Sequence, residues 1–107
     1  MEIKTSDKYC IITPFSQIIN AYEADKIICE IDKNRRTGLD LTYVSECTID
    51  FIEKMSNIKN ISLFNIPSDI FALLNAMNLD KKLNLFVSEL DFIANQHRLI
   101  KREFSIV

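Results

Sequence analysis

The sequence predicts one α/β domain with a small, mostly parallel sheet and about four helices. Three observations lead to this prediction. The 107 residues are the length of a single domain, 48% of them are hydrophobic, and strand-like and helix-like patterns alternate along the chain. Alternation favours parallel pairing, because each helix returns the chain to the edge where the next strand begins. We expect the order β-β-α-β-α-β-α-β-α in a single domain over residues 1–107.

Two short strands and a helix are predicted for the first third of the chain. Glu2–Thr5 and Tyr9–Thr13 flank a polar break, and Pro14 ends the second strand, which predicts a hairpin that either joins the main sheet or stands apart from it. From Asn20, apolar residues recur three and four apart, as in an amphipathic helix. Its expected end is the polar run Asp32–Arg36, whose cations would oppose the negative end of the helix dipole. We interpret this run as a solvated helix end rather than as a nucleic-acid patch.

A strand, a loop and a second helix are predicted for the centre of the chain. Thr37–Val44 contains the only glycine and an alternating, extended stretch, which predicts the third strand. Ser45–Cys47 is the expected loop. The helix that follows is predicted from an apolar stripe formed by Ile49, Ile52, Met55 and Ile58.

Two further strands enclose a third helix. Asn60–Asn65 and Leu83–Val87 are rich in apolar and β-branched residues and predict strands. Pro67 and Ser68 open the helix between them, and Ser68 is its expected N-cap. Its apolar face is predicted to contain Ile70, Leu73, Leu74 and Met77.

The end of the chain predicts a fourth helix and an extension. Ser88–Asp91 resembles a capping box and begins a helix that we expect to run to about His97. Residues 98–107 form the expected C-terminal extension, which would be either one more strand or a docked segment. Phe104–Val107 could also pair across the edge of a homodimer.

Composition excludes several classes of function. The formal net charge of −2 creates no overall positive field for nucleic acid or for an anionic membrane surface. The apolar runs are far shorter than the roughly 20 residues needed to span a bilayer, and the first residues have no signal-peptide core. We therefore expect a soluble, cytoplasmic protein without nucleic-acid binding or direct membrane insertion.

Catalytic and metal-binding patterns are missing from the sequence. A single glycine cannot form a glycine-rich phosphate loop. Cys10, Cys29 and Cys47 are widely spaced, so we expect buried, reduced thiols rather than disulfides or a zinc site. His97 is the only histidine and lies at helical spacing from apolar residues, which is typical of a structural histidine. We expect no enzyme activity, no metal and no cofactor.

One passage resembles a known family. Asp40–Ile52 is similar to the central motif of STAS domains, the sulfate transporter and anti-sigma factor antagonist fold. In that motif a strand ending Asp-Leu-Ser-x-Val leads through a short loop to Asp-Ser-Ser-Gly-Leu at a helix start. Asp40, Leu41 and Val44 match the strand half, and Thr42 takes the serine position.

The resemblance extends over most of the chain, from about residue 8 to about residue 97. The order of elements agrees with it, and Ile61–Asp80 resembles the family's next strand, its helix and the apolar ending of that helix. The resemblance implies a STAS-like fold and a bacterial regulatory domain that acts by protein–protein interaction, with a role in transcription regulation.

The chain departs from the family at the phosphorylation site. Asp50 matches the acceptor serine and Phe51 the glycine that follows. Asp50 would then either imitate a phosphoserine in part or simply complement the dipole at a helix start. Thr48 and Ser45 could accept phosphate instead, although Thr48 also fits a helix N-cap. Phe51 would be either an exposed anchor for a partner or a core residue beside Ile52.

The function that follows is a non-catalytic regulatory domain that resembles an anti-sigma factor antagonist. It would dock on an anti-sigma kinase or a related regulator, without the usual phosphoserine switch. The alternative is a STAS-like accessory subunit of a membrane lipid or anion transporter complex. In open parallel sheets, ligands bind beyond the carboxyl ends of the strands, and we expect the partner site there. The expected site residues are Ser45, Thr48, Asp50, Phe51, Asn65 and Ser68.

Overall fold

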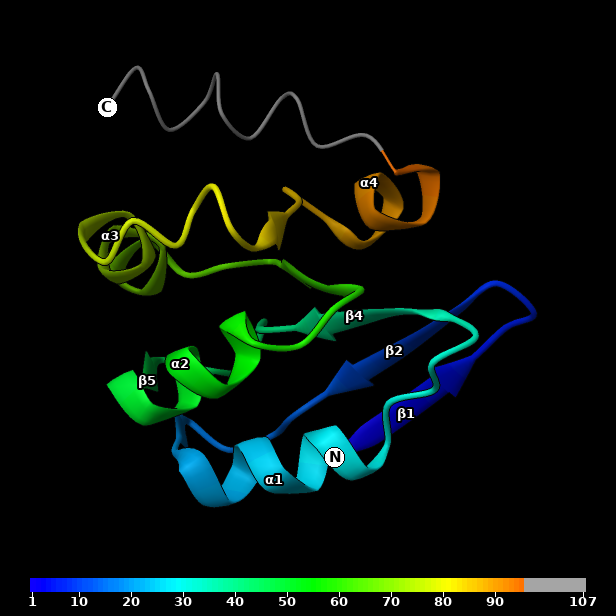
Figure 1. Ribbon diagram of the computed structural model, residues 1–107, viewed down its shortest axis with the longest axis horizontal. Coiled ribbons are helices and arrows are strands. Elements are labelled where there is room, and N and C mark those ends of the chain that lie inside the picture. Colours follow the sequence, from blue (N-terminus) through cyan, green and yellow to red (C-terminus); the bar gives the residue numbers. More distant parts are fainter. Residues whose placement is uncertain (96–107) are drawn as a thin grey trace.

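A computed structural model describes residues 1–95, and its centre is a five-stranded sheet (Figure 1). The strands lie in the order β1-β2-β4-β6-β7. β1 pairs antiparallel with β2, and all other pairings in this sheet are parallel. The prediction of a small α/β domain with a mostly parallel sheet is confirmed, and both N-terminal strands belong to that sheet. Their bounds are β1 (Glu2–Thr5), β2 (Tyr9–Thr13), β4 (Arg36–Asp40), β6 (Ile61–Phe64) and β7 (Asn84–Leu85).

The helices cover both faces of the sheet unequally. α1, α2 and α3 each connect two parallel strands and share one core, whereas α4 packs on the opposite face. Side-chain alternation in β2 divides the two cores, because Cys10 and Ile12 point to the three helices and Ile11 points to α4. α1 and α2 lie side by side in Figure 1. The bounds are α1 (Ala21–Cys29), α2 (Ile49–Ser56), α3 (Ser68–Ala76) and α4 (Glu89–Ala94).

The face under α4 is an aromatic core built around the only glycine. Phe92 stacks on Phe64 with ring centroids 5.5 Å apart, and it meets Phe86 and Tyr9 edge to face. A Cβ atom on Gly38 would lie 2.8 Å from the ring of Phe92. Gly38 is therefore needed for space and not for backbone conformation, since no glycine in residues 1–95 has a positive φ.

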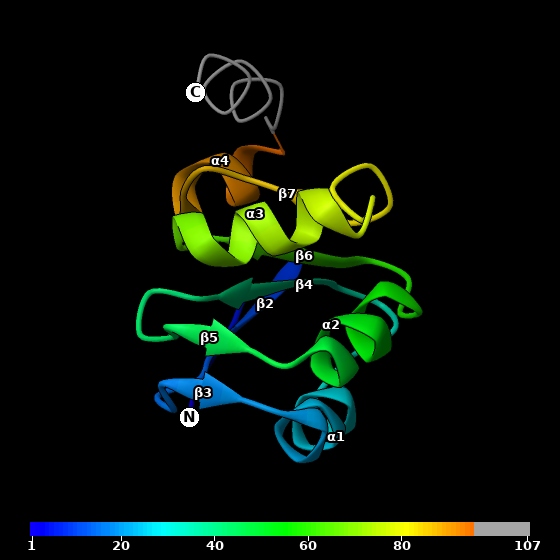
Figure 2. The same ribbon diagram turned by 90° about the vertical axis from the view of Figure 1, so that its left-hand side faces the viewer.

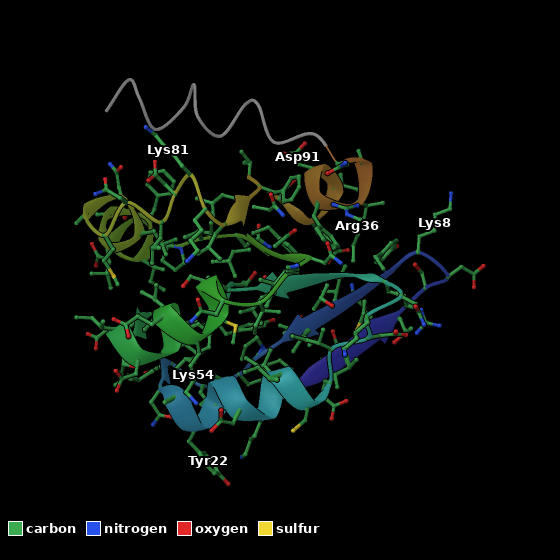
Figure 3. All side chains as sticks on the ribbon, viewed as in Figure 1. Lys8, Tyr22, Arg36, Lys54, Lys81 and Asp91 are labelled. Atoms are coloured by element: carbon green, nitrogen blue, oxygen red, sulfur yellow. The ribbon has the colours of Figure 1, made fainter. Side chains whose placement is uncertain are left out.

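Arg36 fastens the end of α4 to this face. Its Nη2 donates to the carbonyl oxygen of Phe92 at 2.7 Å, and its guanidinium lies 4.5 Å from the centre of the same ring. A cation at a helix C-terminus is favourable, because it faces the negative end of the dipole. Figure 3 shows Arg36 beneath α4. Partial burial lowers the pKa of Arg36.

The polar run Asp32–Arg36 is not the end of the first helix, which corrects the prediction. α1 ends at Cys29, and Asp32 begins a turn in which its carboxylate accepts from the amide of Asn34 at 2.9 Å. Arg35 forms an ion pair with Asp32 at 3.3 Å, and Arg36 is already the first residue of β4. The charged side chains favour a turn here because a short-range carboxylate–amide bond competes with the helix.

The third predicted strand is also shorter than expected. β4 ends at Asp40, and residues 41–45 leave the main sheet instead of extending it to Val44. A second sheet then forms, in which β3 (Ile18–Ile19) pairs in parallel with β5 (Glu46–Cys47). Neither short strand was predicted, because two residues provide no measurable alternation.

The predicted helix caps are confirmed at two of three positions. Thr48 Oγ1 accepts from the amide of Phe51 at 3.2 Å, and Ser88 Oγ accepts from the amide of Asp91 at 3.3 Å. The prediction for Ser68 is wrong, because Ser68 is the first residue of α3 and Pro67 occupies the cap position without a side-chain bond. Proline with φ −59° already has the backbone geometry that leads into a helix.

The fourth helix is shorter than predicted. It ends at Ala94, where Asn95 adopts a left-handed conformation with φ 59°, a common way to terminate a helix. The predicted continuation to His97, the extension over residues 98–107 and the homodimer contact of Phe104–Val107 lie outside the described residues. Among residues 1–95, no helix has the length and apolar character to cross a membrane.

Candidate functional site

The carboxyl ends of β2, β4 and β6 lie at one edge of the sheet, which faces the viewer in Figure 2. Three connections leave this edge toward the helices, and they span residues 14–20, 41–48 and 65–67. β3 belongs to the first connection and β5 to the second, and both lie at the front in Figure 2. We call the carboxyl ends of these strands, together with the three connections, the carboxyl edge.

A polar cluster joins two of these connections. Asp40 Oδ1 accepts from the amide of Thr42 at 3.0 Å, from the hydroxyl of Thr42, and from Nδ2 of Asn65 at 3.1 Å. Asn65 Nδ2 also donates to Thr42 Oγ1 at 3.1 Å. Asn65 has φ 53°, a left-handed conformation that asparagine tolerates better than most residues. The cluster ties the sharp turn after β4 to the end of β6.

Sequence reasoning included Asn65 in the site but missed its two partners there. Asp40 and Asn65 each stand where one of two neighbouring parallel strands ends. That coincidence was a usable signal, since the ends of adjacent parallel strands lie close together. Chemically, the three side chains satisfy one another and form an anchor for the turn.

Backbone hydrogen bonds join the first connection, residues 14–20, to the second, residues 41–48. The carbonyl oxygen of Gln17 accepts from the amides of Ser45 at 2.8 Å and Glu46 at 3.0 Å. The carbonyl oxygen of Ile19 accepts from the amide of Thr48 at 2.9 Å. The short β3–β5 ladder therefore positions the start of α2 against the start of α1.

Three large apolar side chains are exposed on these two connections. Phe15, Ile18 and Tyr43 are 57%, 59% and 55% exposed. The rings of Phe15 and Tyr43 meet edge to face with centroids 5.5 Å apart, so the two connections share one apolar surface. We call these three residues the edge patch. Sequence reasoning missed it, although all three lie outside the apolar helical stripes and the strand Tyr9–Thr13.

A shallow hollow of about 330 Å³ adjoins this patch. Phe15 forms part of its wall, together with the N-terminal methionine and residues from α1. Glu23 and Lys26 supply its charged groups. The hollow widens the surface on which a partner could rest beside Phe15.

The predicted site residues differ in exposure. Ser45 and Asp50 are exposed, on the loop before β5 and in the first turn of α2, and Ser68 is exposed at the start of α3. Thr48 is half-buried and serves as the N-cap of α2. The remaining predicted residue of α2, Phe51, is not on the surface.

Phe51 is a core residue, which decides between the two interpretations of that position. It is 1% exposed and belongs to the buried face of α2 with Ile52 and Met55. The helical period turns Asp50 outward and Phe51 inward, so a partner anchor at Phe51 is wrong. The edge patch, and not Phe51, exposes aromatic rings at this edge.

The cysteines differ from one another, which corrects the expectation that all three are buried. Cys10 is buried, Cys47 is half-buried, and Cys29 is exposed at the end of α1. Burial raises the pKa of the Cys47 thiol to about 12. A thiol with so high a pKa is almost entirely protonated near neutral pH and is a poor nucleophile.

No group of three or more His, Cys, Asp or Glu side chains within residues 1–95 is placed to hold a metal ion. Comparisons of the sequence with protein-family models and with curated proteins give no match. The geometry of the carboxyl edge and the resemblance of Asp40–Ile52 are therefore the grounds for a function.

Proposed function

We propose that this domain is a non-catalytic, cytoplasmic regulatory domain that binds another protein through its carboxyl edge. The edge patch carries the proposal. Aromatic residues are enriched in protein interfaces, and an exposed group of large apolar side chains commonly marks one. Phe15 and Tyr43 already contact each other, so little side-chain freedom remains to be lost when a partner covers them.

The proposed partner is an anti-sigma kinase or a related regulator. The resemblance to STAS domains supports it, as does a hairpin followed by parallel strands with one helix between consecutive strands. Asp50, at the position matched to the family's phosphorylated serine, is exposed at the start of α2. A partner on the edge patch could therefore sense the charge at Asp50.

One observation favours a second candidate, an accessory subunit of a lipid or anion transporter complex. The position matched to the phosphorylated serine holds a carboxylate and has no hydroxyl to modify. A domain without that switch would suit a permanent complex better than a transient one. The two candidates share the same surface and differ in the lifetime of the complex.

Capture experiments with matched tyrosine variants test the proposal. Tyr43→Ala removes a ring of the edge patch, whereas Tyr22→Ala removes a somewhat more exposed tyrosine that points away from the body of the protein in Figure 3. The wild type and Tyr22→Ala are expected to retain the same protein from cytosol of the source cells. Tyr43→Ala and Phe15→Ala are expected to lose it, as measured by quantitative mass spectrometry.

Thermal unfolding of each variant checks that the fold is intact. Equal retention of every captured protein by all four chains would contradict binding at the edge patch. A transient complex with a kinase-like ATPase would favour the regulator, and a stoichiometric, salt-resistant complex with a transporter subunit would favour the second candidate.

A further inference from the structure

Acidic residues and no cations occur in the segments that follow the carboxyl ends of the parallel strands. Four segments contain the connections that leave the carboxyl ends of parallel strands and the first turn of the helix that follows: residues 14–24, 40–52, 65–71 and 86–92. None of them contains a lysine or an arginine. Their acidic residues are Glu23, Asp40, Glu46, Asp50, Asp69, Glu89 and Asp91.

Helix geometry explains only part of this pattern. An acidic residue in a first helical turn complements the positive end of the dipole, which accounts for five of the seven: Glu23, Asp50, Asp69, Glu89 and Asp91. Asp40 is hydrogen-bonded to Thr42 and Asn65. The helix dipole does not explain Glu46, because this exposed residue belongs to β5 and not to a helix. It pairs in register with Ile18, so its charge stands directly beside the edge patch.

Glu46 and Asp50 form no ion pair within residues 1–95. The ion pairs among residues 1–95 are Lys4 with Glu89, Arg35 with Asp32, and Lys54 with Asp25, and none includes Glu46, Asp50 or Asp69.

Lys4 pairs with Glu89, whereas Lys26 lines the hollow beside Phe15 and contributes a positive charge there. Lys4 bonds to Glu89 at 3.2 Å, and this hydrogen bond raises the pKa of Lys4. Lys26 lies 4.5 Å from the centre of the Tyr22 ring. The surface beside Ile18 is therefore acidic, through Glu46, whereas the hollow beside Phe15 contains both Glu23 and Lys26.

We propose that the protein segment that docks on the carboxyl edge is basic and amphipathic, with an apolar side chain on the edge patch and lysine or arginine residues beside Glu46 and Asp50. The inference rests on the proposed function and specifies its partner. Complementary charges at a rim raise the association rate and discriminate against acidic partners. The ring faces of Phe15 and Tyr43 would also attract a guanidinium or ammonium group.

Peptide binding to the full chain tests the inference. The probe is a fluorescein-labelled amphipathic helix of leucine and lysine, about 18 residues long, and its control has glutamate in place of every lysine. Fluorescence anisotropy is expected to show binding of the lysine peptide, weakened by salt, and no binding of the glutamate peptide. Binding of both peptides, or of neither, would overturn the inference.

Two charge-reversal variants distinguish binding at a local site from a general attraction of the peptide to the net charge of the protein. Glu46→Lys is expected to weaken binding of the lysine peptide by about three- to tenfold. Glu30→Lys makes the same change at the exposed C-cap residue of α1, at the end of this helix away from the carboxyl edge. This variant is expected to leave the affinity unchanged. An equal loss in both variants would show that only net charge is sensed, which overturns the inference.

The captured partner then distinguishes this inference from the proposed function. Capture that depends on Tyr43 but is unchanged by Glu46→Lys and by salt leaves the proposed function standing and makes a basic partner wrong. Capture that depends on neither Tyr43 nor Glu46 would contradict both the proposed function and this inference. Self-association in sedimentation that Phe15→Ala abolishes would identify a second copy of the chain as the occupant and also overturn the inference.

Discussion

Two groups of aromatic side chains in this domain differ in burial: one is enclosed in the core and the other is exposed. Phe92 has no exposed surface and meets three other rings, whereas Phe15 and Tyr43 meet no ring but each other within residues 1–95 and are more than half exposed. The first group lies between α4 and the sheet, and the second lies on loops at the carboxyl edge. The comparison shows that similar rings serve stability where a helix covers them and remain available for contact where no element does.

The difference depends on two residues of β4. Gly38 leaves the space into which Phe92 fits, and Arg36 binds the carbonyl oxygen at the end of the helix that carries that ring. Within residues 1–95 no helix covers Tyr43, which is 55% exposed on a turn held by Asp40 and Asn65. We therefore expect the buried rings around Phe92, the closed group, to determine the stability of the fold. We expect the exposed rings Phe15 and Tyr43, the open group, to determine binding.

The largest expected effect is that of Phe92→Ala. Removing a buried ring from a packed aromatic core typically costs about 3–5 kcal/mol of unfolding free energy. Urea denaturation monitored by circular dichroism measures the change. The matched control is Phe15→Ala, which removes the same ring from an exposed position and should change stability by less than about 0.5 kcal/mol. Similar losses in the two variants would break the comparison.

Gly38→Ala is expected to cost about 1–3 kcal/mol, because the added methyl overlaps the rings of Phe92 and Phe64. The same denaturation experiment measures it. In a Phe92→Ala background the cost should shrink, since one of the two rings is gone. An undiminished cost in the double variant would mean that Gly38 is needed for another reason.

Thr48→Ala is expected to cost about 1 kcal/mol through loss of the N-cap of α2. Thr48→Ser keeps an oxygen in reach of the Phe51 amide and should restore most of the stability. A stability equal to wild type in Thr48→Ala would show that the cap contributes nothing at this edge.

Tyr43→Ala is expected to have the smallest effect on folding, within about 0.5 kcal/mol, because its ring is mostly exposed. The same variant is expected to have the clear effect on partner capture described above. A destabilisation of the size expected for Phe92→Ala would show that Tyr43 stabilises the fold. It would contradict the interpretation of the edge patch as a free binding surface.

Local signals predicted much of the fold. The order of the longer strands and the four helices followed from apolar periodicity and turn residues, and the caps at Thr48 and Ser88 followed from residue type and spacing. Each of these depends on residues a few positions apart, so the chain alone contains the information. The location of Asn65 at the carboxyl edge was predicted for the same reason, since it ends the predicted strand Asn60–Asn65.

Tertiary contacts decided the rest. The β3–β5 pair joins residues far apart in the chain, and two residues carry no periodicity that would reveal a strand. Whether an aromatic ring is buried depends on what lies opposite it, so sequence could not separate Phe51 in the core from Phe15 on the surface. Composition and periodicity thus determined the class of fold and most of its elements. Packing between distant segments determined which rings are buried in the core and which remain exposed at the carboxyl edge.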